Sequence, residues 1–580
     1  MSGLVVHSAV VFDGFGVVPE DSVRVRDGHI VEVGRGLRAG PAEDSIDADG
    51  GTVMPGLIDA HVHVGSKGAL VRALRFGVTS VCDQFMDWKL ARQLRDDDNG
   101  DGLDAAALFS AGTLATAPDG HGSKGLVGPV PTLIAPEEAD AFVAERVREG
   151  SDWIKVVYDD FSSYGQSLPT LDEDTLRAVV DAAHRHHRKV VAHIGSLSGA
   201  RVALNAGVDV LGHWVSDALP DNELTDDIRR HGTVVIPTLC LLASVAGHDH
   251  AGLAADQRLA PFLSERDRAE LSRSVGQGQP NINVDNGLAG VAALADAGVP
   301  ILAGTDAPFP GMVHGASLHA ELEALVRAGL SPTASLTAAT SAPAAHLALP
   351  SRGRLAVGYR ADMVLVGGDP TTDITETRNI TAIWKQGRPI TRHPELQRHY
   401  PALVAHGEPL LAVCRGPEIE ALAGTAWMAF TDHVAGGHST ATLRTVDSDA
   451  APSGWAIEVS GEIGRAGGWA GIAVYPRTDR AAADLSAWLG LEVSLRQDHD
   501  RAMAAMLVLD SRGRASPPQR VLHVATSWQP CSLNWNDFEG SDGHDVRLLA
   551  VLAAGAPGPY RFELSAPTLR LALSTDVGVR

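Results

Sequence analysis

Two histidines separated by a single residue, His61 and His63, follow an apolar run near the start of the chain. Residues i and i+2 of a β-strand project from the same side, so both imidazoles could reach one metal ion. Histidine is the commonest metal ligand, yet two histidines on one strand are more often ordinary structural residues. The pair alone is therefore weak evidence for a metal site.

Four more polar residues lie within or at the carboxyl end of predicted apolar strands: Lys155, His193, His213 and Asp306. A lysine inside an apolar strand is costly to bury unless it is neutralised or paired. A lysine that extends to solvent from the strand end is the alternative for Lys155. In barrels of alternating strands and helices, the carboxyl ends of the strands carry the chemistry. Together with the histidine pair, these residues form a set that could hold metal ions.

The elements that must position this set alternate between strand and helix from residue 56 to residue 349. Predicted strands span 78–82, 153–158, 189–193, 208–212, 233–238 and 300–305. Predicted helices between them span 69–76, 172–187, 198–206, 221–231 and 286–297. This repetition predicts an α/β fold, a closed (β/α)8 TIM barrel, with a doubly wound open sheet as the structural alternative.

Strand-rich segments flank the predicted barrel on both sides. Residues 1–55 and 350–390 are expected to combine into one small β-sandwich around the catalytic barrel of 56–349. Residues 391–417 contain prolines and histidines without a periodic pattern and are expected to form a linker. Residues 418–580 return to strand patterns and predict a separate, jelly-roll-like β-sandwich.

The C-terminal segment is rich in tryptophan, with six of the ten tryptophans of the chain. Such rings could stack on sugars, but in a β-sandwich they more often pack in the core. Two further alternatives are that this segment covers the barrel mouth or that it forms a subunit contact. The role of this segment is therefore open at the level of sequence.

Overall charge restricts the class of partner. The chain carries 48 Lys and Arg against 71 Asp and Glu, a formal net charge of −23. This surplus argues against nucleic acid and against an anionic membrane, both of which attract basic surfaces. The four cysteines show no paired spacing, which disfavours a disulfide scaffold or a thiolate zinc site. Without a secretory pattern at the start or an apolar run of membrane length, a cytoplasmic location is expected.

The stretch Met-Pro-Gly-Leu-Ile-Asp-Ala-His-Val-His at 54–63 resembles the opening of the amidohydrolase superfamily. Three further segments, at 119–122, 235–238 and 353–362, are similar to its imidazolonepropionase and prolidase-related branch. The resemblance covers about residues 1–390. The C-terminal region more faintly resembles the β-sandwich of the complex I intermediate-associated family, itself similar to galactose-binding jelly rolls. That likeness is carried by residues 469–471, 484–488 and 535–538.

The first resemblance implies a binuclear metal centre, usually of zinc, at the ligand positions of the barrel strands. His61 and His63, with Asp306, would hold the first ion. His193 and His213 would hold the second. A hydroxide held between two divalent ions has a depressed pKa and attacks carbonyl carbons near neutral pH. Asp306 would take its proton and pass it to the leaving nitrogen.

The same resemblance implies that Lys155 reacts with carbon dioxide and that the resulting carbamate bridges both ions. Burial beside two cations disfavours the ammonium form, and a neutral amine can take up carbon dioxide. The implied reaction is hydrolysis of a peptide-like or N-acyl amide C–N bond in a small molecule. A deaminase of the same superfamily usually holds one metal and lacks the bridging lysine, so Lys155 speaks against it.

Substrate contacts are harder to assign. His121 lies in a glycine-flanked loop and Tyr158 directly follows the lysine strand, so both are candidates for binding substrate. Tyr158 has the opposite strand parity to Lys155, which makes a packing role at least as reasonable. Residues 241–285 carry no recognisable motif and are expected to be a long irregular segment, typical of a lid or substrate loop.

Other functions remain open from sequence. The same centre could cleave a lactone, an ester or a cyclic amide. From a different class, the barrel could be catalytically inactive and carry a binding β-sandwich. Metal content separates these classes, since an enzyme of the proposed kind holds about two equivalents per chain. A homo-oligomer is possible.

Overall fold

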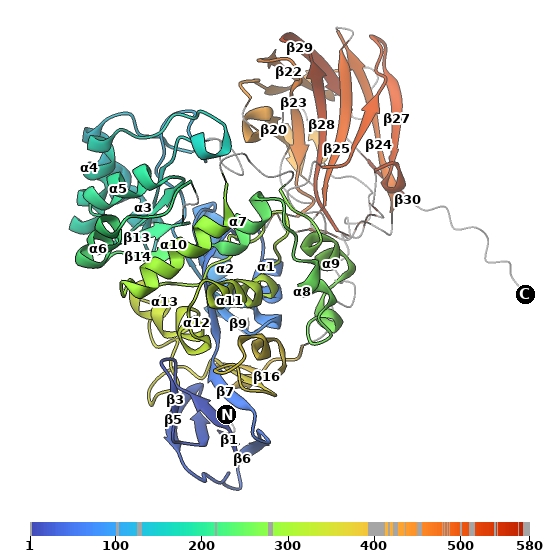
Figure 1. Ribbon diagram of the computed structural model, residues 1–580. Coiled ribbons are helices and arrows are strands. Elements are labelled where there is room, and N and C mark those ends of the chain that lie inside the picture. Colours follow the sequence, from blue (N-terminus) through green and yellow to red (C-terminus); the bar gives the residue numbers. More distant parts are fainter. Residues whose placement is uncertain are drawn as a thin grey trace, which may run out of the picture. The chain divides into compact units, whose positions relative to one another are not determined.

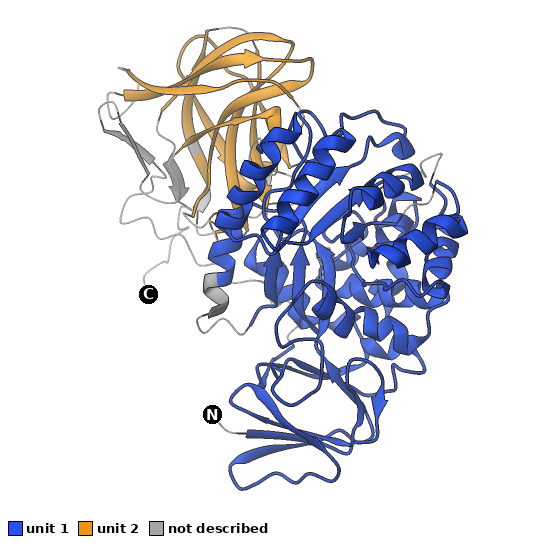
Figure 2. Cartoon of the chain, turned by 90° about the vertical axis from the view of Figure 1, so that its left-hand side faces the viewer, with its two compact units in different colours: residues 1–126, 130–395 blue, residues 127–129, 396–580 orange. Residues whose placement is uncertain are grey.

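The structure is a computed structural model of the 580-residue chain. It divides into two compact units, residues 1–126 with 130–395 and residues 127–129 with 396–580 (Figure 2). The structure describes residues 3–99, 104–123, 130–214, 217–275, 282–392, 412–415, 418–421, 427–435, 437–448, 455–477, 480, 482–483, 485, 488–498, 501–509, 517–538, 541, 543, 545–565 and 568–571.

Parallel strands form the centre of the first unit. One sheet joins β8 (Leu57–Val62), β9 (Val78–Asp83) and β10 (Ala107–Ser110). A second joins β11 (Ile154–Tyr158), β12 (Val190–Ile194), β13 (Val210–Gly212) and β14 (Val234–Ile236). These strands are buried along nearly their whole length, as expected of parallel strands covered on both faces. Polar residues in them are therefore conspicuous.

Backbone hydrogen bonds extend both sheets beyond the regular strands. Ala115, downstream of β10, bonds to β11 through its N–H and carbonyl. The segment 300–307 bonds to β14 on one side and to β8 on the other, for example from Leu302 N to the Val235 carbonyl and from Ala60 N to the Ala303 carbonyl. The strand predicted at 300–305 is thus reduced to isolated bridges at Ile301 and Ala307, although its backbone is paired on both sides.

Helices follow most of the strands (Figure 1). They are α1 (Lys67–Arg75), α2 (Trp88–Asn99), α3 (Ala139–Glu149), α4 (Glu173–Arg185), α5 (Leu197–Asn205), α6 (Asn222–His231), α10 (Val284–Asp296), α11 (Ala316–Arg327), α12 (Pro332–Ala338) and α13 (Ser341–His346). Side-chain caps fix several starts: Asp172 accepts from Thr175 N, and Asp221 accepts from Leu224 N. Such caps satisfy amides that the helix leaves without partners.

The expectation of an irregular segment at 241–285 is wrong for its described part. The chain there forms three short helices, α7 (Leu239–Val245), α8 (Ala251–Ala255) and α9 (Glu265–Leu271), before α10 begins. Each has seven residues or fewer, so it spans too few turns for a helical period to show in the sequence. Residues 276–281 lie outside the described part.

The two flanks of the parallel region share a small β-structure. One sheet has the order β5 (His29–Gly34), β4 (Ser22–Arg26), β1 (Gly3–His7) and β6 (Glu43–Asp47). The other has the order β17 (Arg388–Pro389), β16 (Ile380–Lys385), β15 (Met363–Val366), β7 (Thr52–Pro55), β2 (Val10–Phe12) and β3 (Val17–Val18). β15 pairs antiparallel with β7, with Val364 opposite Met54. Segments from both flanks therefore lie in one sheet.

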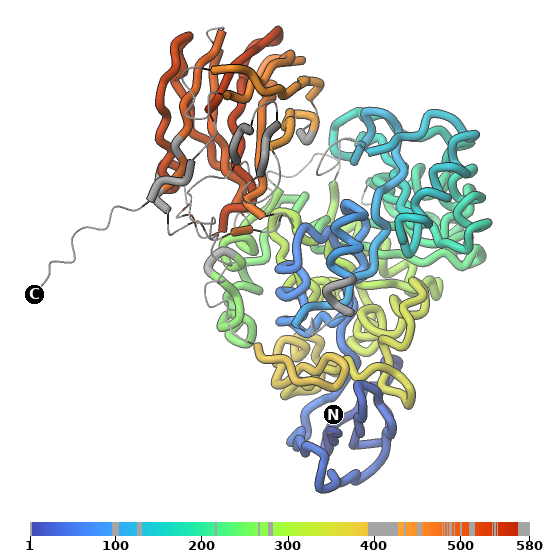
Figure 3. Tube along the Cα trace, turned by 180° about the vertical axis from the view of Figure 1, so that it is seen from behind, coloured from blue at the N-terminus to red at the C-terminus, as the bar shows by residue number. Residues whose placement is uncertain are grey.

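The second unit is rich in strands (Figure 3). One sheet has the order β20 (Met428–Thr431), β23 (Gly468–Val474), β28 (Val546–Gly555), β25 (Ala502–Leu509) and β26 (Gln519–Leu522). The other contains β21 (Thr442–Asp447), β22 (Trp455–Ile463), β29 (Gly558–Leu564), β24 (Trp488–Gln497) and β27 (Gln529–Asn534), with β30 (Thr568–Leu571) beside β24. One apolar cluster draws residues from both sheets, and it includes the buried rings of Trp427 and Trp535.

Most of the expected linker at 391–417 lies outside the described residues. Within it, residues Ala412–Arg415 form β18, which pairs with β19 (Glu418–Ala421). Across the described part of the chain, no helix combines the length and the apolar character that spanning a membrane requires.

Candidate metal centre

Two imidazoles and a carboxylate come together at the ends of β8, β13 and the segment 300–307. One ligand atom each from His61, His213 and Asp306 lies within 4.8 Å of the other two. His63 joins them, with its Nε2 2.9 Å from Asp306 Oδ1, while His61 Nε2 lies 3.4 Å from the same oxygen. Imidazole nitrogen and carboxylate oxygen are ligands that zinc prefers, so the donor set suits a divalent ion.

His193 and Lys155 lie beside this group on the next two strands. The ring centres of His193 and His213 are 4.4 Å apart. A methyl group built on Gly212 would stand 3.3 Å from Lys155 Nζ, so the amine lies against the strand that carries His213. The structure thus brings together all six residues that the sequence predicts as ligands.

The polar atoms of this group are buried, and several lack ordinary partners. Within the described chain, Lys155 Nζ and both ring nitrogens of His61 have no hydrogen-bond partner. Buried polar groups are nearly always satisfied, so such atoms need an explanation. A bound cation supplies one, because it would coordinate the imidazole and would be neutralised by anionic neighbours. On this test the residues fit a metal site.

Burial also sets the protonation of the group. It lowers the pKa of His61 and of His213 well below the ordinary value, and it lowers the pKa of Lys155 to about 8. For Asp306, burial acts to raise the pKa, but the neighbouring His63, His213 and Lys155 hold it below its usual range. The favoured forms are therefore neutral imidazoles and a carboxylate, which are the forms that bind metals.

Each of three histidines has one ring nitrogen held by a neighbour. Nδ1 of His63 lies 3.3 Å from the Phe85 carbonyl, and Nδ1 of His213 lies 2.9 Å from Thr238 Oγ1. For His193 it is Nε2 that is held, 3.2 Å from Asp159 Oδ2. Such contacts orient a ring and select which nitrogen is presented to an ion. The contact leaves Nε2 available on His63 and His213, and Nδ1 on His193.

Asp59 holds the segment that ends in Asp306. Its Oδ1 accepts from Thr305 N at 3.0 Å and its Oδ2 accepts from Thr305 Oγ1 at 2.8 Å. Asp306 itself has φ of +59° and His213 has φ of +75°, a left-handed backbone that is uncommon for such residues. Strained residues of this kind gather at functional sites, where the surroundings hold them in place.

The two predicted substrate contacts differ in position. The His121 ring centre lies 5.1 Å from that of His193 and 4.5 Å from that of Phe161, so His121 adjoins the site. Tyr158 is partly buried against the helical side of its strand, where its ring edge would lie 3.9 Å from a methyl group on Gly199 of α5. The structure does not bring Tyr158 together with the candidate ligands.

Sequence reasoning missed Asp159, Thr238, Asp59 and Phe161 as residues of the site. Asp59 stands inside the motif at 54–63, which was a usable sign. Asp159 directly follows the strand predicted at 153–158, as many loop residues do, and Thr238 ends both the strand predicted at 233–238 and the family-like segment at 235–238. Their contacts depend on left-handed turns at Phe161 and Thr238 that the sequence does not reveal.

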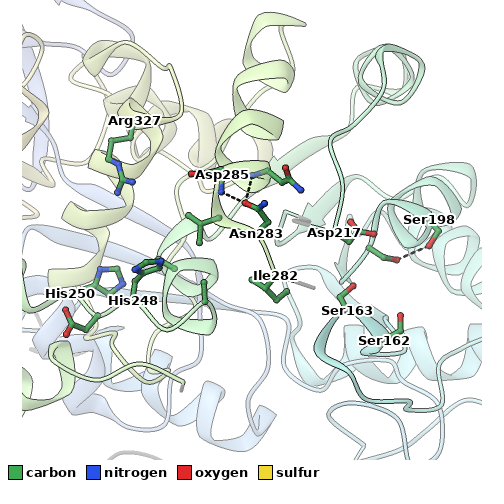
Figure 4. A pocket seen from close by; sticks show the side chains of 16 residues that line it. Ser162, Ser163, Ser198, Asp217, His248, His250, Ile282, Asn283, Asp285 and Arg327 are labelled. Atoms are coloured by element: carbon green, nitrogen blue, oxygen red, sulfur yellow. Dashed lines mark hydrogen bonds between the residues drawn. The ribbon is translucent and has the colours of Figure 1, made fainter. Parts of the chain in front are cut away.

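A cavity of about 1240 Å³ opens among the segments that follow β11 to β14. Figure 4 shows Ser162, Ser163, Ser198 and Asp217 at one end and His248, His250 and Arg327 at the other. Its lining includes none of the six candidate ligands. Its wall nevertheless adjoins the site, because Ser163 Oγ donates to the Gly195 carbonyl and Gly195 packs against Asp159, the partner of His193.

The sequence is similar to that of several known proteins. An uncharacterized protein of Mycobacterium tuberculosis is 28% identical over 358 residues, which is 60% of this chain and 84% of the relative. Ochratoxinase of Aspergillus niger is 26% identical over 393 residues, or 58% of this chain and 75% of the relative.

Solved structures resemble the same region. A Xaa-Pro dipeptidase with bound methionine matches with a TM-score of 0.54 and 24% identity, covering 67% of this chain and 99% of the other. Aspergillus niger ochratoxinase matches with a TM-score of 0.54 and 21% identity, covering 68% and 96%. These neighbours imply a TIM-barrel domain, with additional strand-rich structure in this chain. The model of the Amidohydrolase family matches residues 52–390, and the chain belongs to this family.

Proposed function

We propose that this chain is a metal-dependent hydrolase that cleaves a peptide-like or N-acyl amide C–N bond in a small molecule. The observation that carries the proposal is the convergence of four imidazoles and a carboxylate at the ends of neighbouring parallel strands, with the buried amine of Lys155 inside β11 beside them. The prolidase-like and ochratoxinase neighbours support an amide as the bond that is cleaved.

We assign the ligands as the resemblance to the amidohydrolase superfamily implies; in space, the ring of His213 lies nearly as close to that of His61 as to that of His193. His61, His63 and Asp306 would hold one divalent ion, with zinc the expected metal. His193 and His213, whose rings adjoin, would hold the second. Bound there, a pair of divalent ions supplies activation of water and polarisation of the substrate carbonyl.

Lys155 is assigned a carbamate that joins the two halves of the site. Its Nζ is buried without a hydrogen-bond partner among the described residues, and this burial lowers its pKa to about 8 although Asp306 and Asp83 favour the charged form, so the neutral amine is more accessible than in an exposed lysine. A neutral amine adds to the carbon of carbon dioxide and releases one proton, which leaves an anionic carbamate on Nζ. That anion would help to hold the divalent ions and would remove the cost of a buried positive charge.

Asp306 is assigned the transfer of a proton. Its Oδ1 is within 3.4 Å of His61 of β8 and of His63, which follows that strand, and its backbone is fixed by the contact of Thr305 with Asp59. A carboxylate held in this way would accept a proton from the attacking water and deliver it to the leaving nitrogen. The low pKa of Asp306 keeps it ionised before the reaction begins.

A closed eight-stranded barrel is the architecture we infer for the catalytic unit. Support comes from the segment 300–307, which bonds to both β8 and β14, and from Ala115, which bonds to β11. These contacts connect the edges of the two parallel sheets. In such a barrel every candidate ligand lies at or near the carboxyl face, where this architecture places its chemistry.

The cavity beside the site is assigned to the part of the substrate that extends beyond the scissile bond. It is lined by hydroxyl, amide, imidazole and carboxylate groups, so it favours a polar substrate over an apolar one. One end carries Asp217 among hydroxyl groups, and the other carries Arg327 with His248, Asp249 and His250, so each end would bind polar or charged groups of the substrate.

The test is metal analysis combined with a substrate screen. The purified chain should hold about two equivalents of divalent metal, lose them to a chelator and regain activity when zinc is restored. The screen compares dipeptides, N-acyl amino acids, esters and lactones. A chain that binds no metal under any of these conditions would instead support the inactive-barrel alternative. Faster turnover of esters or lactones than of amides would reassign the reaction.

A further inference from the structure

Thr238, directly after β14 and just before α7, has an unusual backbone. Its φ is +48° and its ψ is +51°, the left-handed region. A β-branched residue rarely adopts this conformation, because its side chain clashes with the adjacent backbone. Such a residue persists only when its surroundings hold it there. The structure therefore must contain contacts that fix Thr238.

One such contact comes from a separate helix. Glu321 of α11 is fully buried, and its two carboxylate oxygens accept from Leu239 N at 2.9 Å and from Cys240 N at 2.8 Å. These are the first two amides of α7, which Thr238 does not cap with its own side chain. Free amides at a helix start need acceptors, and a buried carboxylate needs donors. The pairing fixes the start of α7, and hence Thr238, against α11.

The pairing of Glu321 with the start of α7 fixes the position of the Thr238 hydroxyl group. Thr238 Oγ1 lies 2.9 Å from Nδ1 of His213, and both side chains are buried. One ring nitrogen of His213 lies within 4.8 Å of a ligand atom of His61 and of Asp306, and Nε2 is the nitrogen that the contact with Thr238 leaves free. A residue that accepts the Nδ1–H of His213 would leave the Nε2 lone pair free for a metal ion.

We propose that Thr238 and Glu321 are positioning residues that set the tautomer and orientation of His213. Thr238 Oγ1 accepts the Nδ1–H, and Glu321 holds Thr238 in the backbone conformation that brings this oxygen into place. The inference rests on the proposed function, because it concerns a ligand of the proposed metal centre. Neither residue touches the reacting atoms.

The chain offers a matched control in Thr233, at the other end of the same strand. Thr233 is as deeply buried as Thr238, and its Oγ1 donates to the Val208 carbonyl at 3.0 Å. Thr233→Val and Thr238→Val each replace a buried hydroxyl by a methyl group of similar shape. They differ in whether that hydroxyl faces a candidate ligand. Thr238→Ser keeps the hydroxyl and serves as the rescue variant.

The experiment measures Co²⁺ affinity of the metal-free full-length protein by the visible absorption of the bound ion. Loss of a contact that orients a ligand typically weakens metal binding by about 10–100-fold. We expect this loss for Thr238→Val, with wild-type affinity in Thr233→Val and near-wild-type affinity in Thr238→Ser. Melting temperatures of the two valine variants show whether a general loss of stability accounts for the result.

Glu321→Gln tests the second step. Glutamine keeps one acceptor oxygen but presents an amide N–H₂ to the other backbone N–H, so it should weaken Co²⁺ binding less than Thr238→Val does. If both residues act through one contact, the double variant binds no more weakly than Thr238→Val alone. Losses that simply add in the double variant would overturn the coupling between the two residues.

The outcomes separate this inference from the proposed function. Wild-type protein that binds no Co²⁺ would overturn the metal centre and the positioning role together. Wild-type protein that binds Co²⁺ tightly, with Thr238→Val binding as tightly as Thr233→Val, would overturn the positioning role and leave the metal centre intact.

Discussion

At the scale of single residues, the candidate ligands stand out because each violates the pattern of its strand. An imidazole, an amine or a carboxylate occurs where the neighbouring positions are apolar and buried, and the structure places these exceptions side by side. The residues around them were not foreseeable in the same way. Thr238 and Asp159 are ordinary loop residues until a tertiary contact gives them a partner. Prediction from residue type therefore reached the candidate ligands that the structure brings together, but not the groups that orient them.

The role of Asp306 can be tested without removing the side chain. Asp306→Asn keeps the size and one oxygen of the side chain but cannot accept and deliver a proton as a carboxylate does. We expect metal content close to that of the wild type and a loss of kcat of about 10²–10⁴-fold, the usual contribution of a positioned acid–base group. Metal analysis and steady-state kinetics on the same preparation decide the matter. Near-normal turnover would end the assignment of Asp306.

At the scale of elements, the predicted bounds agree with the structure where a helix is long and residues at its ends cap it. Helix α6 was predicted at 221–231 and is found at Asn222–His231, because Asp221 caps its start and Gly232 ends it in a left-handed conformation. Segment 300–305 was predicted as a strand, but it forms only an isolated bridge at Ile301, and the left-handed Asp306 directly follows it. Helices α7 to α9 were missed because they are short. Hydrophobic periodicity predicts helices of several turns. It does not predict short helices that depend on tertiary contacts.

The segment 300–307 packs closely against β8 at Gly304, so we expect a side chain at this position to disturb the candidate metal centre. A methyl group there would stand 2.8 Å from His61 Cβ and 2.6 Å from Ile236 Cγ2. Gly304→Ala should therefore push the segment away from β8 and weaken metal binding, although it removes no polar group. Metal titration of the variant measures the effect. Gly252→Ala, where a methyl group meets no atom within 4 Å, is the control; equal affinities in both variants would contradict the argument.

Helix α11 carries a buried histidine that should make the fold sensitive to acid. His319 lies between the Phe76 carbonyl and Thr377 Oγ1, and burial lowers its pKa to about 3 from 6.5. A group with a depressed pKa takes up its proton more readily when unfolded. The stability that it contributes is therefore complete above pH 6.5 and declines as the pH falls from 6.5 toward 3.

The measurement compares melting temperatures at pH 7 and pH 5. His319→Leu loses two hydrogen bonds and should melt lower at both values, but its drop between pH 7 and pH 5 should be smaller than that of the wild type. His231→Leu, at the exposed end of α6, should keep the wild-type drop. An unchanged pH dependence in His319→Leu would show that other groups govern the acid response.

At the scale of the whole molecule, the chain combines a family domain with a strand-rich unit that has its own apolar core. The family match ends at residue 390, and among the described residues the cluster of the second unit draws only on Trp427 and residues after it. The likeness of this unit to the complex I intermediate-associated family stays a prediction, as do a homo-oligomer and a cytoplasmic location. The buried Trp427 and Trp535 favour core packing for two of its six tryptophans.

Separate cores imply that metal should stabilise only one part of the chain. The main apolar cluster of the first unit and the cluster of the second share no residue. A ligand that binds only the folded state raises stability by an amount that grows with the ratio of its concentration to its Kd, about 4 kcal/mol at 1,000-fold excess. All six candidate ligands belong to the first unit. Differential scanning calorimetry should therefore show two transitions, and a chelator should lower one by several degrees while leaving the other in place. A single transition, or equal shifts of both, would show that the two units unfold together.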